Sequence, residues 1–231
     1  MENSIYDIDN GLSRKISNIA IWMSLGLMVS AIVAAYIYFT GLWYTFAVAL
    51  NGYGSILLLM LQLALVVILS SRLKSMTISS ARILFLVYAA ITGINLSVLP
   101  VIYEIRSMFI AFGLSSVMFI NIAIIANRTK RDMTKLRPYL MVGLIMLILI
   151  NVVGYFINLT AIEMIVNYLA VFLFMGLTLY DVQKIKKMYI YYANNNDEDM
   201  MEKLTILGAL ELYLDFINMF LYVLRIVGKR K

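Results

Sequence analysis

MIVNYLAVFLFMGLTLYD, residues Met164–Asp181, is an uncharged apolar run of 17 residues that ends in an aspartate. A helix that crosses the hydrocarbon core of a bilayer needs roughly 20 mostly apolar residues. The run therefore predicts a membrane-spanning helix with an acidic side chain at one end. Because an ionisable residue in a spanning helix costs roughly 2.5–3.5 kcal/mol on insertion scales, Asp181 is a candidate functional residue.

The rest of the 231-residue chain has the same character. It is 63% hydrophobic and 14% charged, with a mean hydropathy of +0.89, whereas soluble domains are about half apolar and a quarter charged. We predict an all-α integral membrane protein of seven transmembrane helices, built as a single integral domain over residues 1–231. The expected elements are an N-terminal tail at 1–16 and helices near 17–40, 45–70, 82–103, 107–127, 136–158, 163–191 and 203–228.

Basic residues alternate along the predicted loops. They occur in the tail, in the loop at 72–82, in the loop at 128–137 and in the segment 184–203, while the first and fifth loops contain none. This pattern predicts a cytoplasmic N-terminus by the positive-inside rule, and it explains the basic residues better than nucleic-acid binding does. The basic residues Lys229–Lys231 would then end outside, unless the last segment dips into the membrane and returns.

Two residue types are absent from the sequence. Without cysteine there can be no disulfide, no thiolate nucleophile and no cysteine metal site. Without histidine, the usual switch between pH 5 and 8, a pH response would have to come from a carboxyl group.

Three acids lie within the last two predicted spans: Asp181, Glu211 and Asp215. Asp181 and Asp215 are equidistant from residue 198, inside the polar loop that joins these spans. An antiparallel hairpin about that loop would bring the two aspartates to the same depth. Glu211 lies one turn before Asp215 on the same helix face, and Asn218 extends this polar face at i+3.

Two carboxyl groups in one low-dielectric site cannot both ionise cheaply, so we expect the pair to share one proton. Such a pair titrates in two steps that belong to the pair as a whole. Asp181 and Asp215 also offer the hard oxygen ligands that Ca²⁺ prefers. The alternative is that the acids are neutral, hydrogen-bonded packing groups, or that they pair with Arg72 or Arg225.

At these residues the sequence resembles the transmembrane Bax inhibitor motif family, which includes the Bax inhibitor and YccA-like membrane proteins. The two specific matches are Gly176–Ile185 (GLTLYDVQKI) and Ala209–Tyr222 (ALELYLDFINMFLY). Supporting matches are Tyr88–Gly93 (YAAITG) and Thr129–Met133 (TKRDM). The resemblance extends from the second predicted helix to the end of the chain.

The resemblance implies that the last helix is central and is surrounded by the other six. It also implies a pH-sensitive calcium leak, in which Asp181 and Asp215 share a proton in the closed state. Arg72 matches an arginine that interacts near the pair, and Arg225 resembles an arginine that helps to latch the closed form. The chain departs from the family pattern in two ways: helix two has no acid to pair with Arg225, and Glu211 adds a third acid.

The first functional hypothesis is thus a passive, proton-gated pathway for Ca²⁺ across a bacterial inner membrane, with no catalytic residue and no cofactor. The second is an interaction protein that binds a membrane protease or another membrane partner, with structural aspartates. An intramembrane aspartyl protease is disfavoured because the last helix lacks a Gly-x-Gly-Asp element. No phosphate-binding loop is present to indicate an energised pump.

Overall fold

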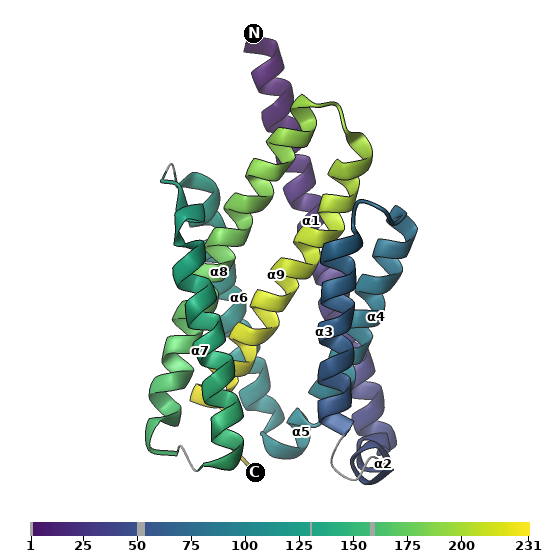
Figure 1. Ribbon diagram of the computed structural model, residues 1–231. Helices are drawn as coiled ribbons and strands as arrows, with labels where there is room; N and C mark the ends of the chain where they lie inside the picture. Colours follow the sequence, from purple (N-terminus) through teal and green to yellow (C-terminus); the bar gives the residue numbers. More distant parts are fainter. Residues whose placement is uncertain (1, 50–53, 130, 158–159) are drawn as a thin grey trace. The chain divides into compact units, whose positions relative to one another are not determined.

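The computed structural model describes residues 2–49, 54–129, 131–157 and 160–231. These residues form helices and no strand, apart from one isolated bridge between Tyr103 and Arg230. Figure 1 colours the helices from purple to yellow along the chain. They are α1 (Glu2–Thr40), α2 (Leu42–Ala49), α3 (Gly54–Arg72), α4 (Ile78–Leu96), α5 (Leu99–Ile102), α6 (Ile105–Arg128), the 3₁₀ helix η1 (Met133–Leu136), α7 (Arg137–Phe156), α8 (Thr160–Asn194) and α9 (Glu198–Val227). Within the described residues, six helices are long and apolar enough to span a membrane, and a shorter apolar helix covers Met60–Arg72. This confirms the predicted all-α membrane fold.

Several boundaries differ from those predicted. The tail expected at 1–16 is helical from Glu2 onward, since a helix that has formed extends by one hydrogen bond per added residue, whether or not that residue is apolar. The third span begins at Ile78 instead of residue 82, because the Thr77 side chain caps the helix by accepting a hydrogen bond from the Ser80 amide. Residues 50–53, within the helix expected at 45–70, lie outside the described residues.

The helix expected at 82–103 is broken at Ser97 and Val98, which separate α4 from α5. Pro100 explains the break, because proline has no amide hydrogen to donate to the carbonyl oxygen of Leu96, four residues earlier, and its ring crowds that carbonyl group. The Ser97 amide closes α4 on the carbonyl oxygen atoms of Gly93 and Ile94. The signal for this break was present in the sequence.

The chain falls into two compact units. Unit 1 comprises residues up to Ile102 together with Met188–Tyr213, and unit 2 comprises Tyr103–Lys187 and Leu214–Lys231. Both long C-terminal helices, α8 and α9, contribute a segment to each unit. The expectation of one integral domain stays a prediction.

Unit 1 is organised by close packing of α1 against α4. A Cβ atom added to Gly93 would lie 2.6 Å from the Ser30 carbonyl oxygen. The Ser30 hydroxyl also donates to the carbonyl oxygen of Ala89 at 2.7 Å and lies 2.6 Å from the Tyr213 hydroxyl. A backbone approach this close requires glycine, so Gly93 acts as a helix-packing residue.

Unit 2 is organised by aromatic contacts on the second half of α9. Phe112 and Phe119 of α6 meet the ring of Phe216 edge-on, with centroids 5.3 and 5.6 Å away. Phe174 of α8 stacks on Tyr222 with centroids 6.0 Å apart. Such pairs contribute about 0.5–1.5 kcal/mol each beyond the area that they bury.

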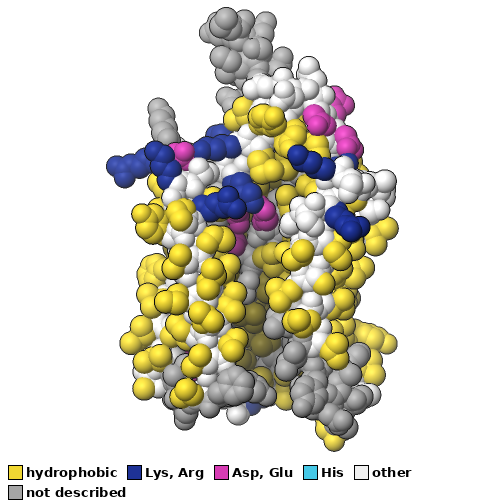
Figure 2. Space-filling model, viewed as in Figure 1, with side chains coloured by type: hydrophobic (Ala, Val, Ile, Leu, Met, Phe, Trp, Pro, Cys, Tyr) yellow, Lys and Arg dark blue, Asp and Glu magenta, His cyan; other side chains and the backbone are white. Residues whose placement is uncertain are grey.

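Helix α9 is the most buried of the candidate spans. In its most apolar 18-residue window 72% of the residues are buried, against 39% or less in each of the other five. The other spans expose large side chains, such as Phe109 and Phe172, to the surroundings. Figure 2 shows such hydrophobic side chains covering the visible face of the helices of unit 2, as a lipid-facing surface requires.

The length of α9 distinguishes between a spanning helix and a segment that enters the membrane and turns back. It is one uninterrupted helix of 30 residues, about 45 Å long at 1.5 Å per residue, so the alternative in which it dips in and returns is wrong. Its tail is held by ion pairs from Lys229 to Glu104 at 2.9 Å and from Arg230 to Glu163 at 3.3 Å. Glu104 raises the pKa of Lys229, and Tyr103, followed by Glu163, raises the pKa of Arg230. The ion pairs offset the charge of the basic tail at that end of unit 2.

Candidate functional site

Asp181 lies where the apolar part of α8 ends and its basic part begins. Its side chain is buried, with 9% of the residue exposed. The ammonium nitrogen of Lys184, one turn further along the helix, lies 3.8 Å from Asp181 Oδ1 and 5.9 Å from the centroid of the Tyr180 ring. Asp181 therefore has a positive charge beside it.

Asp215 lies on α9 and is buried more deeply, with 4% of the residue exposed. It belongs to unit 2, as Asp181 does. Asn218, expected to extend the polar face, donates its side-chain amide to the carbonyl oxygen of Leu214 on its own helix at 2.8 Å. Asn218 thus bonds to the backbone of its own helix.

The turn between α8 and α9 sets the relative depth of the two aspartates. It consists of residues 195–197, with Asn196 in the left-handed region at φ 54°, and is centred two residues earlier than expected. Asp181 precedes the end of α8 by 13 residues and Asp215 follows the start of α9 by 17. The four-residue difference corresponds to about 6 Å, or one helical turn, measured along the two helices. The expected equal depth of the two aspartates stays a prediction.

Glu211 and Arg72 belong to unit 1. Glu211 is half-buried on α9, one turn before Asp215, and Arg72 is exposed in the last turn of α3. Their expected roles beside the aspartate pair stay predictions.

Arg225 has contacts that the sequence did not reveal. Its Nη1 atom donates to Asn151 Oδ1 on α7 at 3.5 Å, and its guanidinium lies 4.9 Å from the centroid of the Tyr222 ring. Asn151 also donates to the Tyr222 hydroxyl at 3.1 Å. The arginine is thus held within unit 2 by an amide and an aromatic ring.

Gln62, which lies in the second predicted span, is part of a hydrogen-bond network in unit 1. Its side-chain amide donates to the Thr92 hydroxyl at 2.8 Å, and its carbonyl oxygen accepts from Asn95 at 2.9 Å. These contacts join α3 to α4 and satisfy polar groups that would otherwise be costly within a membrane.

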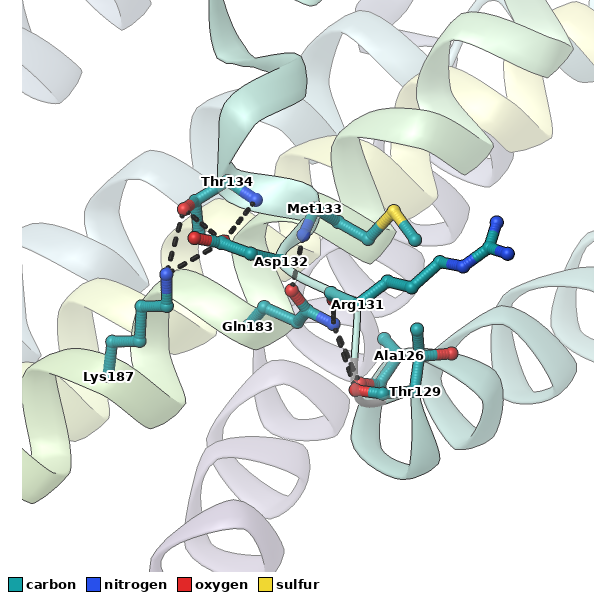
Figure 3. Close-up of polar contacts among 8 residues, drawn as sticks. All are labelled: Ala126, Thr129, Arg131, Asp132, Met133, Thr134, Gln183 and Lys187. Atoms are coloured by element: carbon teal, nitrogen blue, oxygen red, sulfur yellow. Dashed lines mark hydrogen bonds and ion pairs between the residues drawn. The ribbon is translucent and has the colours of Figure 1, made fainter.

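Two further residues of α8 hold the connection between α6 and α7 (Figure 3). The buried side chain of Gln183 accepts from the Met133 amide at 2.8 Å and donates to the Arg131 carbonyl oxygen at 3.1 Å. Lys187 donates to Asp132 at 2.7 Å, and this contact, with those from Thr134, lowers the pKa of Asp132 to about 2. Gln183 and Lys187 are four residues apart on one face of α8, a spacing that could have revealed them.

No group of three or more acidic, histidine or cysteine side chains in the described part of the chain is arranged to hold a metal ion. Ca²⁺ takes six to eight oxygen ligands. Asp181 and Asp215 could supply only some of these, with carbonyl groups or water supplying the rest. Such a donor set is suited to brief contact with a passing ion, and less to permanent binding.

Comparison of the sequence with known proteins identifies the family of the chain. Residues 12–231 match the family described as inhibitor of apoptosis-promoting Bax1. The chain is 35% identical to the inner membrane protein YbhL of Escherichia coli (strain K12), over 99% of this chain and 97% of that protein. It is 34% identical to an uncharacterized protein of Borreliella burgdorferi, over 90% and 89%, and 31% identical to an uncharacterized membrane protein of Streptococcus pyogenes serotype M1, over 96% and 95%. The chain therefore belongs to the Bax inhibitor family of integral membrane proteins.

Proposed function

We propose that the protein is a passive, proton-gated pathway for Ca²⁺, in which Asp181 and Asp215 share the gating proton. The observation that carries the proposal is the burial of both carboxyl groups within the same compact unit. The family membership and the apolar helices support a membrane pathway. The name of the Escherichia coli relative supports placing it in a bacterial inner membrane, and the loop charges support a cytoplasmic N-terminus.

The directions of the two side chains favour a meeting of the carboxyl groups. In a helix every Cα–Cβ bond tilts toward the N-terminus. Asp181, which is nearer the turn between α8 and α9, leans away from that turn, and Asp215, which is further from it, leans toward it. The two tilts together reduce the axial offset of about one helical turn between the residues.

Lys184 makes the two carboxyl groups unequal. Its ammonium group lies 3.8 Å from Asp181, and a nearby cation lowers the cost of one ionised carboxyl group in the pair. In the closed state the site then holds one negative charge, one positive charge and one neutral acid. This is a less costly arrangement than two buried anions.

Loss of the proton supplies the energy for opening. Two like charges at about 4 Å repel by roughly 4 kcal/mol at an effective dielectric constant near 20. Inverting a two-state population from 1:99 to 99:1 takes about 5.5 kcal/mol. The repulsion is thus of the right size to shift a closed state substantially toward open as the pH rises.

The test is Ca²⁺ flux into proteoliposomes between pH 5 and 9 for the parent chain, Asp181→Asn and Asp215→Asn. We expect flux in the parent that rises with pH, and a flattened pH response in both variants, because neither can form a pair of anions. Absence of flux, or an unchanged pH profile in both variants, would reject the proposal. That result would favour the interaction protein, in which the aspartates are structural.

A further inference from the structure

The connection between α6 and α7 is a basic surface whose described residues are bound by side chains of α8. Residues 128–137 contain five cationic residues and one acid, Asp132. Gln183, with 7% of its residue exposed, binds both an amide and a carbonyl group of this connection. Longer contacts of 3.4 Å reach the carbonyl oxygen atoms of Ala126 and Thr129. One buried amide thus holds the connection at several points along its length.

The single acid of the connection, Asp132, is bound by neighbouring groups and does not neutralise the other cations. Asp132 accepts hydrogen bonds from Lys187 at 2.7 Å and from the Thr134 amide at 3.0 Å. Its pKa of about 2 keeps it ionised and bound to Lys187 at any physiological pH. The other described cations of the connection are all exposed, and none of them has an ion-pair partner among the described residues: Arg128, Arg131, Lys135 and Arg137.

The basic surface lies where it can contact the lipid headgroups. It joins the ends of two candidate spans, which places it at the level of the lipid headgroups. Tyr139, 75% exposed, lies just inside α7, as aromatic residues do at membrane interfaces. In Figure 3 the Arg131 side chain extends away from Gln183, and Figure 2 shows basic side chains protruding at this end of unit 2.

We infer that the α6–α7 connection is a binding surface for the headgroups of anionic phospholipids. Arginine binds phosphate through two parallel hydrogen bonds, and each basic residue near an anionic membrane surface contributes about 1 kcal/mol. The opposite end of unit 2 provides a contrast, because Lys229 and Arg230 are paired with Glu104 and Glu163. The inference is independent of ion transport.

The test uses the full chain, purified in detergent and incubated with equal amounts of phosphatidylglycerol and phosphatidylcholine that carry identical acyl chains. Native mass spectrometry counts the lipids that stay bound. We expect the parent to retain phosphatidylglycerol over phosphatidylcholine by roughly tenfold or more. Arg131→Gln/Lys135→Gln should lower the ratio several-fold, because Arg128 and Arg137 remain, whereas Lys229→Gln/Arg230→Gln, which removes the same charge, should leave it unchanged.

A third variant, Gln183→Leu, tests whether the surface is built by the fold. It keeps every charge but removes the anchor of the connection, so the ratio should fall. The inference is overturned if the parent shows no preference, if both double variants lower the ratio equally, or if a folded Gln183→Leu protein keeps the full ratio. The double variants change only exposed side chains and should fold. They therefore test whether the α6–α7 connection binds anionic lipid even if Gln183→Leu does not fold.

Discussion

Lys184 forms an ion pair with Asp181, one member of the proposed aspartate pair. Its ammonium nitrogen lies 3.8 Å from Asp181 Oδ1. In the sequence it is one of a group of lysines that the positive-inside rule explains, so its contact with Asp181 was not expected. The i, i+3 spacing was the available signal.

Lys184→Met should shift the pH response of Ca²⁺ flux toward higher pH. Without the cation, losing the shared proton creates two buried anions with no adjacent positive charge, so a higher pH is needed to remove that proton. Flux into proteoliposomes at a series of pH values gives the midpoint. Lys186→Met removes the same charge two residues away and should leave the midpoint in place, and equal shifts in both variants would contradict a specific role for Lys184.

The Asp132–Lys187 pair predicts how stability depends on acidity. The pKa of Asp132 falls from its ordinary 3.8 to about 2 in the folded protein, so the pair stabilises the folded state above about pH 4 and this contribution is lost as the pH falls toward 2. In thermal unfolding, Asp132→Asn should be less stable than the parent at pH 6, and the difference should shrink below pH 4. Lys187→Met should cause a similar loss, and the double variant should lose less than the sum. Additive losses would show that the two side chains do not interact.

At the scale of elements, close packing of α1 and α4 depends on a glycine. A Cβ atom on Gly93 would meet the Ser30 carbonyl oxygen at 2.6 Å and the Val33 Cβ atom at 2.8 Å. Neither can move aside without shifting a helix backbone. Gly113 on α6 provides a natural comparison, because nothing lies within 4 Å of its hypothetical Cβ atom.

Gly93→Ala should therefore lower the free energy of unfolding by about 1–3 kcal/mol, the usual cost of overpacking. Gly113→Ala should leave it unchanged or raise it by about 0.5–1 kcal/mol, because alanine favours the helix. Unfolding of the detergent-solubilised variants measures both. If Gly93→Ala is as stable as Gly113→Ala, α1 and α4 do not approach as closely as described.

The elements also show how far the sequence alone could lead. Long uncharged runs predicted the spans, and charged residues within them identified Asp181, Glu211 and Asp215. The position of the turn at 195–197 was not predictable, because the adjacent residues Asn194–Asp197 all favour turns. The partners of Gln62, Gln183 and Arg225 were not predictable either, because they depend on how each helix is rotated, and helices that are apolar on most sides carry little periodicity to fix that rotation.

At the scale of the whole molecule, the buried helix α9 takes part in both compact units. Its segment up to Tyr213 belongs to unit 1, and its segment from Leu214 onward, which carries Asp215, belongs to unit 2. The basic residues are exposed around the α6–α7 connection, whereas those of the C-terminal tail are paired with acids. We therefore propose proton sensing in the interior of unit 2 and lipid contact at its basic end.

The central claim is that Asp181 and Asp215 hold one proton between them. Infrared titration of the purified protein measures this directly, through the stretching band of protonated carboxyl groups in the parent, Asp181→Asn and Asp215→Asn. We predict coupled behaviour, in which either substitution changes the midpoint at which the remaining aspartate loses its proton. If each substitution removes its own share of the band and leaves the other midpoint unchanged, the two aspartates are independent and the mechanism is wrong.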